Sequence, residues 1–333
     1  MELFQKYGTN HRNSNIALYG INTDGIPFYR RESVVTSIHE NVQQQIAIGC
    51  SKDKSKLKFL VLGYLSGFGK SRLLVEFFES CIRNNIFYVP IYITFNSITS
   101  LNRHDTFPEC FIGWRVLYSY LSPTVSWTNF MKYLMSLNVE FDLEIIIEFI
   151  IRDICAIRNC SREMISVVLL IDEFQRPKGD MFKALMDTLV ALMFSTTVNV
   201  VPVLAGLYMS FIYEYSEQSF INVARIVMPP LTIDDGFKIA AHMASKYPIM
   251  QQQLDPNSNQ HLQWIICRCH AVPRILELIL DRCVKSRVQI DEELYRTFIS
   301  SHHSDLKMQL RNHIFYATWL VELVSYSLLS LIS

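Results

Sequence analysis

Short apolar runs alternate along the chain with longer segments in which apolar residues recur every three or four positions. Runs of this length, rich in β-branched and aromatic residues, are typical of strands, and the longer periodic segments are typical of amphipathic helices. The predicted strands are residues 58–65, 87–95, 165–174, 198–207 and 224–229. Because strands alternate with helices, the pattern predicts an α/β fold with a parallel five-stranded sheet flanked by helices.

The helical segments between the strands show their buried sides in the spacing of their apolar residues. From Lys70 to about Asn84, apolar side chains return at a period of 3.6 and form a single face. This face consists of Leu73, Leu74, Phe77, Phe78 and Cys81. Further helices are predicted within residues 110–160 and over residues 180–195. In the third strand, Val167–Ile171 is an uninterrupted apolar run, which predicts a strand covered on both faces.

Beyond Pro229–Pro230 only the helical pattern continues. Thr232 and Asp235 have the spacing of a capping box, which predicts that a helix starts there. More helices are predicted over residues 258–285 and 291–310, so we expect a small all-helical lid after the sheet. The predicted division is an N-terminal segment (1–50), a core domain (51–230), a helical lid (231–312) and an apolar C-terminal helix (313–333).

The final stretch of the chain, IFYATWLVELVSYSLLSLIS, is apolar apart from a single charge, Glu322, and a series of serines. Its length is enough to span a bilayer. However, the serines and Glu322 recur every three or four positions, as on the polar face of an amphipathic helix. We expect a helix that packs on a domain or on a partner, and a membrane anchor is the alternative.

A glycine turn, SGFGKS, joins the first predicted strand to the following helix at residues 66–71. It ends like the Walker A pattern G-x-x-x-x-G-K-[ST], but Tyr64 stands where the first glycine belongs, and Gly63 is one residue too early. A phosphate cradle needs small residues that permit a tight turn, followed by a helix N-terminus. The turn therefore predicts a nucleotide site, with contacts from Gly67, Phe68, Gly69, Lys70, Ser71 and Arg72.

The acidic pair Asp172 and Glu173 follows the apolar run of the third strand. Because ligands of open α/β sheets lie at the carboxyl ends of the strands, this pair and the glycine turn are predicted to meet there. In the predicted site, Lys70 lies against the β- and γ-phosphates of ATP, and Ser71 and Asp172 hold Mg²⁺. Glu173 is the predicted general base that polarises the attacking water. The alternative is an ordinary strand-to-helix turn beside an acidic helix cap.

Composition narrows the class of protein without identifying a partner. Half of the residues are hydrophobic, which excludes a disordered chain and predicts a sizeable core. Lys plus Arg and Asp plus Glu both number 31, so the net charge is zero and bulk charge neither requires nor forbids nucleic acid. A cluster of lysines between Lys52 and Lys58 is expected to be a solvated loop, with a phosphate-contacting patch as the alternative.

The eight cysteines include no C-x-x-C pair, and most lie inside apolar runs. Cys267, Cys269 and His270 are close in sequence, but residues two apart on a helix point to different faces, and no second pair lies at zinc spacing. We therefore expect buried thiols, which favour a reducing compartment. The N-terminal residues also lack the apolar stretch of a signal peptide. An intracellular location, in cytoplasm or nucleus, is expected.

Several short sequences occur in the order found in ATPase domains of the AAA+ and STAND type: SGFGKSRLL, VVLLIDEF, PVLAGL, MPPLT and AVPRILEL. The chain most resembles the P-loop module of Crinkler-type and retrotransposon hot spot proteins, over roughly residues 25–290. The resemblance implies a P-loop ATPase whose lid motion acts on a nucleic-acid or protein partner. It also leaves open self-association and secretion as an effector. A nucleotide-gated binding module with little or no hydrolysis is the alternative.

Further positions carry expectations that come from the resemblance. Arg274 in AVPR matches the lid arginine that AAA+ domains direct at the γ-phosphate, and a surface arginine is the alternative. Arg225, before MPPLT, is a weaker candidate for a finger that contacts a neighbour's nucleotide. FYRRES at residues 28–33 matches F-x-G-R-E, with Arg30 in place of the glycine. Leu207 follows Ala-Gly where the family usually has a polar residue that orients water, so nucleotide binding is expected more firmly than rapid hydrolysis.

Overall fold

The computed structural model describes most of the chain between residues 28 and 286. The described residues are 28, 30–48, 56–64, 67–84, 88–96, 108–121, 125–136, 142–195, 198–207, 210–219, 221–268, 273–286, 290 and 293. Apart from Glu293, the predictions for residues 291–310 and 313–333 lie outside these ranges. Within these ranges, no helix combines the length and the apolar character that crossing a membrane requires.

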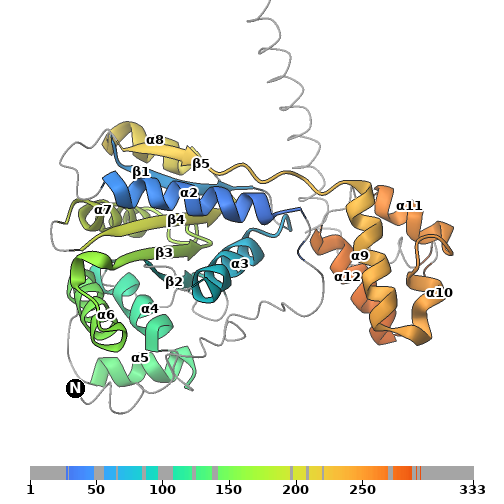
Figure 1. Ribbon diagram of the computed structural model, residues 1–333, viewed down its shortest axis with the longest axis horizontal. Helices are drawn as coiled ribbons and strands as arrows, with labels where there is room; N and C mark the ends of the chain where they lie inside the picture. Colours follow the sequence, from blue (N-terminus) through green and yellow to red (C-terminus); the bar gives the residue numbers. More distant parts are fainter. Residues whose placement is uncertain are drawn as a thin grey trace, which may run out of the picture. The chain divides into compact units, whose positions relative to one another are not determined.

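A five-stranded sheet in the order β2-β3-β4-β1-β5 forms the centre of the first structural unit (Figure 1). All of its strand pairings are parallel. The strands are β1 (Lys58–Gly63), β2 (Tyr88–Thr94), β3 (Ser166–Asp172), β4 (Val200–Gly206) and β5 (Asn222–Arg225). The predicted parallel α/β sheet is therefore confirmed.

Strands β3 and β4 are the most buried elements of the sheet. All residues of β3 and β4 are buried, because each strand is paired on both sides and lies between helices. Every side chain of Val167–Ile171 has an exposed fraction of 0%. This confirms the prediction made from their uninterrupted apolar run. The carboxyl ends of β1 and β4 lie side by side, with Gly63 paired to Gly206.

The last strand is shorter than predicted and begins earlier. It was expected over residues 224–229 and spans Asn222–Arg225. The N–H of Met228 donates to the hydroxyl of Tyr64 instead of to a neighbouring strand. Pro229–Pro230, which comes next, has no N–H to donate. The ladder therefore cannot continue to the predicted end.

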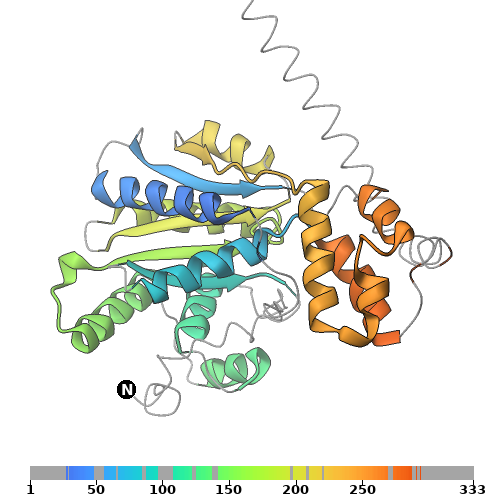
Figure 2. The same cartoon turned by 45° about the vertical axis from the view of Figure 1, so that its right-hand side comes forward.

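Helices cover both faces of the sheet, with α2 and α3 on one face and α4, α6 and α7 on the other (Figures 1 and 2). This arrangement follows from right-handed crossovers, because the chain moves one way across the sheet from β1 to β2 and the opposite way from β2 to β3 and β4. The helices of this unit are α2 (Glu32–Ile48), α3 (Lys70–Arg83), α4 (Pro108–Leu121), α5 (Trp127–Ser136), α6 (Leu143–Arg158), η3 (Arg162–Met164), α7 (Asp180–Phe194) and α8 (Ser210–Ser219).

Two of these helices, α2 and α8, are absent from the predicted elements. The signal for α2 is nevertheless present in the sequence, because its buried residues recur every three or four positions. They are Val34, Ile38, Val42 and Gln45. The predicted apolar face of α3 is confirmed, since its named residues are all buried.

The described residues from Pro229 to Ser286 belong to a second compact unit, together with two short segments that include Arg30 and Gly67–Gly69. Thr232 and Asp235 exchange hydrogen bonds, with 3.2 Å from the Asp235 N–H to the Thr232 Oγ1 and 2.8 Å from the Thr232 N–H to the Asp235 Oδ2. The predicted capping box is therefore confirmed. The helices are α9 (Ile233–Lys246), η4 (Pro248–Met250), α10 (Gln251–Leu254), α11 (Gln260–Arg268) and α12 (Pro273–Ser286), around a hydrophobic core of their own.

The cysteines follow the prediction only in part. Cys81 and Cys283 are buried, and burial raises the pKa of the Cys81 thiol to about 12. Cys155 and Cys160 are half-buried. For Cys267 the expectation of a buried thiol is wrong, because this residue lies off the buried face of α11 and is exposed. Over the described part of the chain, no group of three or more His, Cys, Asp or Glu side chains is placed to hold a metal ion.

Candidate nucleotide site

The described part of the turn between β1 and α3, Gly67–Gly69, has a backbone conformation that favours glycine at two positions. Gly67 and Gly69 have φ angles of 84° and 88°, in the left-handed region that residues with a Cβ rarely adopt. Phe68 between them is buried. The turn leads directly into α3, which begins at Lys70, and a helix N-terminus attracts negative charge. Both glycines are therefore required by the shape of the turn.

Lys70 stands at this helix start with only 4% of its surface exposed. Its Nζ donates a hydrogen bond to the carbonyl oxygen of Tyr64 at 2.8 Å. Burial lowers the pKa of Lys70 to about 8, and the negative charges of Asp172 and Glu173 oppose this decrease. A phosphate beside the ammonium would offset the cost of burying its charge. The contact of Lys70 with a phosphate remains a prediction.

Asp172 ends β3 and is 2% exposed. Burial raises the pKa of its carboxyl group, and the nearby hydroxyls of Ser71 and Tyr92 oppose this increase. The Tyr92 hydroxyl donates to Oδ2 at 2.9 Å, whereas Oδ1 is buried and has no hydrogen-bond partner among the described residues. Such an oxygen destabilises the fold by about 1–3 kcal/mol or more unless a ligand satisfies it. A carboxylate oxygen and a serine hydroxyl side by side fit Mg²⁺, which prefers oxygen ligands.

Glu173 follows in an unusual backbone conformation, with a φ of 58°. This left-handed conformation is strained for a residue other than glycine, and such strain is common at functional sites. Its Oε2 accepts hydrogen bonds from Gln175 Nε2 at 2.9 Å and from Arg176 Nε at 3.2 Å. The next N–H, that of Phe174, donates to the carbonyl of Ala205 on β4. The turn after β3 is therefore fixed to the neighbouring strand, and it holds the predicted base from two sides.

Tyr64, which replaces the first glycine of the Walker A pattern, is a buried residue with contacts at both ends. Its N–H donates to the carbonyl of Gly206 at 3.2 Å, and its own carbonyl accepts from Lys70. The hydroxyl accepts from the Met228 N–H, and the Arg225 guanidinium lies over the ring, 5.3 Å from its centroid. A tyrosine is accommodated here because Arg225, at the end of β5, and the Met228 backbone contact its side chain. Arg225, the weaker finger candidate, thus contacts a residue of its own chain.

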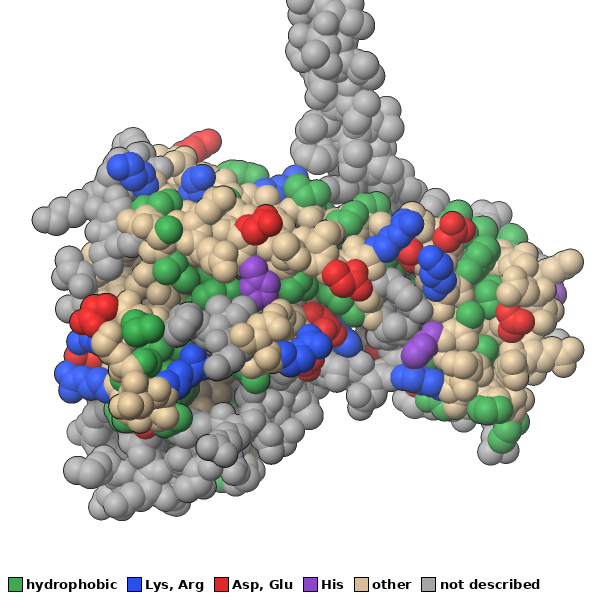
Figure 3. Space-filling view, in the orientation of Figure 1, with side chains coloured by type: hydrophobic (Ala, Val, Ile, Leu, Met, Phe, Trp, Pro, Cys, Tyr) green, Lys and Arg blue, Asp and Glu red, His purple; other side chains and the backbone are tan. Residues whose placement is uncertain are grey.

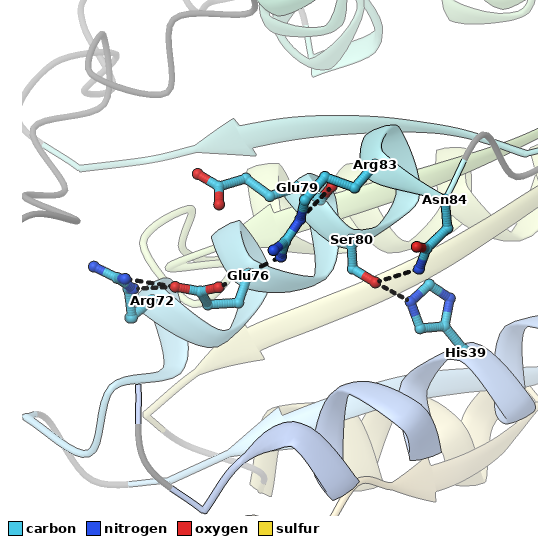
Figure 4. A network of polar contacts seen from close by, with 7 residues as sticks. All are labelled: His39, Arg72, Glu76, Glu79, Ser80, Arg83 and Asn84. Carbon is cyan, nitrogen blue, oxygen red and sulfur yellow. Dashed lines mark hydrogen bonds and ion pairs between the residues drawn. The ribbon is translucent and has the colours of Figure 1, made fainter. Parts of the chain in front are cut away.

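The structure describes the side-chain contacts of only one of the two arginines in the predicted site. Arg72 lies on α3 and forms an ion pair with Glu76, with 2.5 Å between Arg72 Nη2 and Glu76 Oε1 (Figure 4). Its guanidinium is therefore engaged along its own helix. Arg274 is the second residue of α12, and its side chain lies outside what the structure describes. Their nucleotide contacts remain predictions.

Arg30 and Leu207 are two further positions that depart from the family pattern. Arg30 has a φ of 52°, which accounts for the glycine that the resembling family has there. Its Nε lies 3.3 Å from Asp235 Oδ1, so an ion pair in the second unit accompanies the strained backbone. Leu207 follows the end of β4 and is half-buried.

The structure adds residues that sequence reasoning does not identify. Tyr92 contacts Asp172 because β2 and β3 are paired, and the sequence does not reveal that pairing. Gln175 contacts Glu173 through the turn. Arg31 is 3% exposed, burial lowers its pKa to about 10 with Tyr64 opposing, and its Nη1 and Nη2 have no hydrogen-bond partner in the described ranges. Apart from its place in FYRRES, the sequence contains no signal that would predict the burial of Arg31.

The comparisons with known proteins concern the fold. No protein-family model and no curated protein matches the chain. The Walker-type ATPase PABY2304 of Pyrococcus abyssi superposes with a TM-score of 0.53 at 13% identity, over 86% of this chain and 76% of that one. The ORC2 protein of Aeropyrum pernix in ADPNP–ADP complexes gives 0.49 at 13% identity, over 88% and 72%. The ORC1 protein of the same organism in complex with DNA gives 0.46 at 13% identity, over 87% and 69%.

The first of these comparisons shows that the sheet and its helices have the fold of a Walker-type ATPase. At this identity the likeness extends to the fold alone. The narrower resemblance to Crinkler-type and retrotransposon hot spot proteins stays a prediction.

Proposed function

We propose that the chain binds Mg-ATP at the carboxyl ends of β1 and β3 and hydrolyses it. The observation that carries this proposal is the buried Asp172 carboxylate, which keeps one oxygen without a partner among the described residues while Ser71 lies beside it. The alternative of an acidic helix cap has little support, because α7 begins only at Asp180 and Asp172 lies inside a strand. The Walker-type ATPase fold supports the same conclusion.

Each residue of the site has a defined part in the proposed reaction. The turn Gly67–Gly69 and the start of α3 surround the phosphates, and Lys70 donates to their oxygens. Ser71 and Asp172 would hold Mg²⁺, which supplies positive charge to the phosphates when it is bound. Glu173 accepts a proton from the attacking water, whose oxygen forms a bond to the γ-phosphorus as the bond to the ADP oxygen breaks. The products are ADP and inorganic phosphate.

The proposed purpose of hydrolysis is a motion of the helical unit that acts on a nucleic-acid or protein partner, with Arg274 reporting the γ-phosphate. Charge does not favour one kind of partner. The net charge is zero, and the face shown in Figure 3 carries acidic and basic side chains close together. The partner therefore stays a prediction from the resemblance.

The test compares the wild type with Lys70→Ala and Glu173→Gln, using a fluorescent ATP analogue for binding and phosphate release for turnover. We expect Lys70→Ala to abolish binding, because it removes the buried cation of the phosphate site. Glu173→Gln should keep the affinity and reduce turnover by roughly 10²- to 10⁴-fold, the usual contribution of a general base.

The exposed Lys178→Ala is the matched control and should leave both measurements unchanged. Equal affinity in Lys70→Ala would disprove the phosphate site, and equal turnover in Glu173→Gln would disprove the base. Binding without turnover in the wild type would favour the nucleotide-gated module over the ATPase.

A further inference from the structure

The end of β4 lacks a polar side chain of its own, and another residue lies against it. β4 ends at Gly206, and the next residue is Leu207. A Cβ atom on Gly206 would lie 2.3 Å from Gln175 Oε1 and 2.4 Å from Phe174 Cε1. Contacts this short do not occur, so the glycine is what allows the turn after β3 to approach the end of β4. The position next to the absent side chain belongs to the Gln175 amide.

The two ends of that amide are in different environments. Nε2 donates to Glu173 Oε2 at 2.9 Å. Because a carboxylate only accepts hydrogen bonds, this contact requires the nitrogen of the amide to face Glu173 and the oxygen to face Gly206. Oε1 is buried and has no hydrogen-bond partner among the residues that the structure describes. A free acceptor therefore lies beside the carboxylate proposed as general base.

Arg176 contacts the same carboxylate oxygen but in a different setting. The distance from its Nε to Oε2 is 3.2 Å, and its side chain is 60% exposed. Water and salt weaken an exposed ion pair, and a long flexible side chain fixes a partner's position poorly. The packed amide of Gln175 is thus the better restraint on the direction of the Glu173 carboxylate.

We propose that Gln175 is a positioning residue for hydrolysis, which holds the Glu173 carboxylate and accepts a hydrogen bond from the attacking water through Oε1. It would supply, from the turn after β3, the polar group that the end of β4 lacks. The inference rests on the proposed ATPase function. It also explains why Leu207 need not prevent turnover, since the polar group comes from a different strand end.

The experiment uses the full chain with Gln175→Met, which keeps the length of the side chain and removes both polar atoms, and Gln175→Glu, which removes the donor. Phosphate release gives kcat and KM, and a fluorescent ATP analogue gives the affinity. We expect kcat to fall by about 10- to 100-fold in both variants, as when an orienting partner is removed from a site. KM and affinity should stay within about 2-fold of the wild type, because the amide does not contact the nucleotide in the proposal.

A double-mutant cycle separates positioning from simple loss of structure. In the Glu173→Gln background, Gln175→Met should lower kcat no further, since the residue acts through that carboxylate and its water. Gln263→Met is the matched control, because the Gln263 Nε2 donates to the Pro256 carbonyl at 2.6 Å within the helical unit. This control should leave kcat unchanged.

Each other outcome has a distinct meaning. Unchanged kcat in Gln175→Met, or a full additional loss in the Glu173→Gln background, would overturn the role of Gln175. A parallel loss of affinity and melting temperature would overturn it too, as a purely structural effect. If the wild type binds ATP without turnover, the inference fails while nucleotide binding stands. If the wild type binds no ATP, the proposed function fails with it.

Discussion

The hydroxyl of Tyr64 accepts a hydrogen bond from the backbone N–H of Met228 at 2.5 Å, and both residues are buried. Tyr64 lies at the end of β1, where its carbonyl also accepts from Lys70. Met228 is the last residue of the first compact unit before Pro229. One side chain thus connects the start of the glycine turn to the segment that leads out of the sheet. A glycine at position 64 could not make this connection.

Replacing Tyr64 by Phe should destabilise the protein by about 1–3 kcal/mol, because the buried Met228 N–H would lose its partner. Urea unfolding measures the change. Tyr213→Phe is the control, since Tyr213 is 45% exposed and water can replace its protein contacts. Equal stability of Tyr64→Phe and wild type would mean that the Met228 N–H finds another partner.

Adding a methyl group at Gly206 should displace the turn that carries Glu173 and Gln175. The new Cβ would lie 2.3 Å from Gln175 Oε1, so either the side chain or the turn must move. We expect Gly206→Ala to lose about 1–3 kcal/mol of stability, typical of overpacking, and most of its turnover. Unfolding curves and phosphate release check the two effects.

Gly179→Ala provides the comparison for Gly206→Ala. Gly179 has a φ of 56°, but a Cβ there would meet no atom within 4 Å. Its φ of 56° with a ψ of −128° is a conformation almost confined to glycine, so its replacement should cost about 1–3 kcal/mol of stability but leave turnover intact. If Gly179→Ala lost turnover as Gly206→Ala does, the close packing of Gln175 on Gly206 would be irrelevant to the site.

Acidification should destabilise the protein through His39. Burial lowers the pKa of His39 from 6.5. Its Nε2 lies 3.0 Å from the Ser80 hydroxyl (Figure 4). Its Nδ1 contacts the Tyr88 hydroxyl. The unfolded chain therefore binds this proton at a higher pH than the folded chain. The contribution of neutral His39 to stability is fully present above pH 6.5, and it is lost as the pH decreases toward the lower pKa of the folded state.

Between about pH 7.5 and pH 5.5, the free energy of unfolding should decrease less for His39→Gln than for the wild type, because that variant lacks the titrating ring. Urea unfolding at both pH values measures it. The exposed His261→Gln should show the wild-type loss. An identical loss in His39→Gln would assign the acid sensitivity to other groups.

Alkylation should distinguish the described thiols. Cys267 is exposed, whereas Cys81 and Cys283 are buried and the pKa of Cys81 is raised to about 12. Because the thiolate is the reactive form, iodoacetamide at neutral pH should modify Cys267 before Cys81 and Cys283 in the folded chain. Mass spectrometry of peptides gives the order. Modification of Cys81 at the same rate would show that the helix α3 opens readily.

Much of the sheet and of the helical unit could be predicted from local patterns. Val167–Ile171 requires cover on both faces whatever its neighbours are, and Thr232 with Asp235 caps a helix within one turn. The end of β5 could not be predicted in this way, because it depends on a hydrogen bond from Met228 to Tyr64, which is distant in sequence. Local propensity carries no information about such a partner.

The sequence by itself determined the α/β order, the glycine turn that leads into Lys70, and the acidic pair at the end of the third strand, because each depends on residues adjacent in the chain. Only the tertiary structure decided which groups surround them. The strand order places Tyr92 against Asp172 and brings Gln175 onto Gly206. Strand order and burial arise from contacts between distant segments, so the polar environment that completes the proposed site exists only in the folded chain.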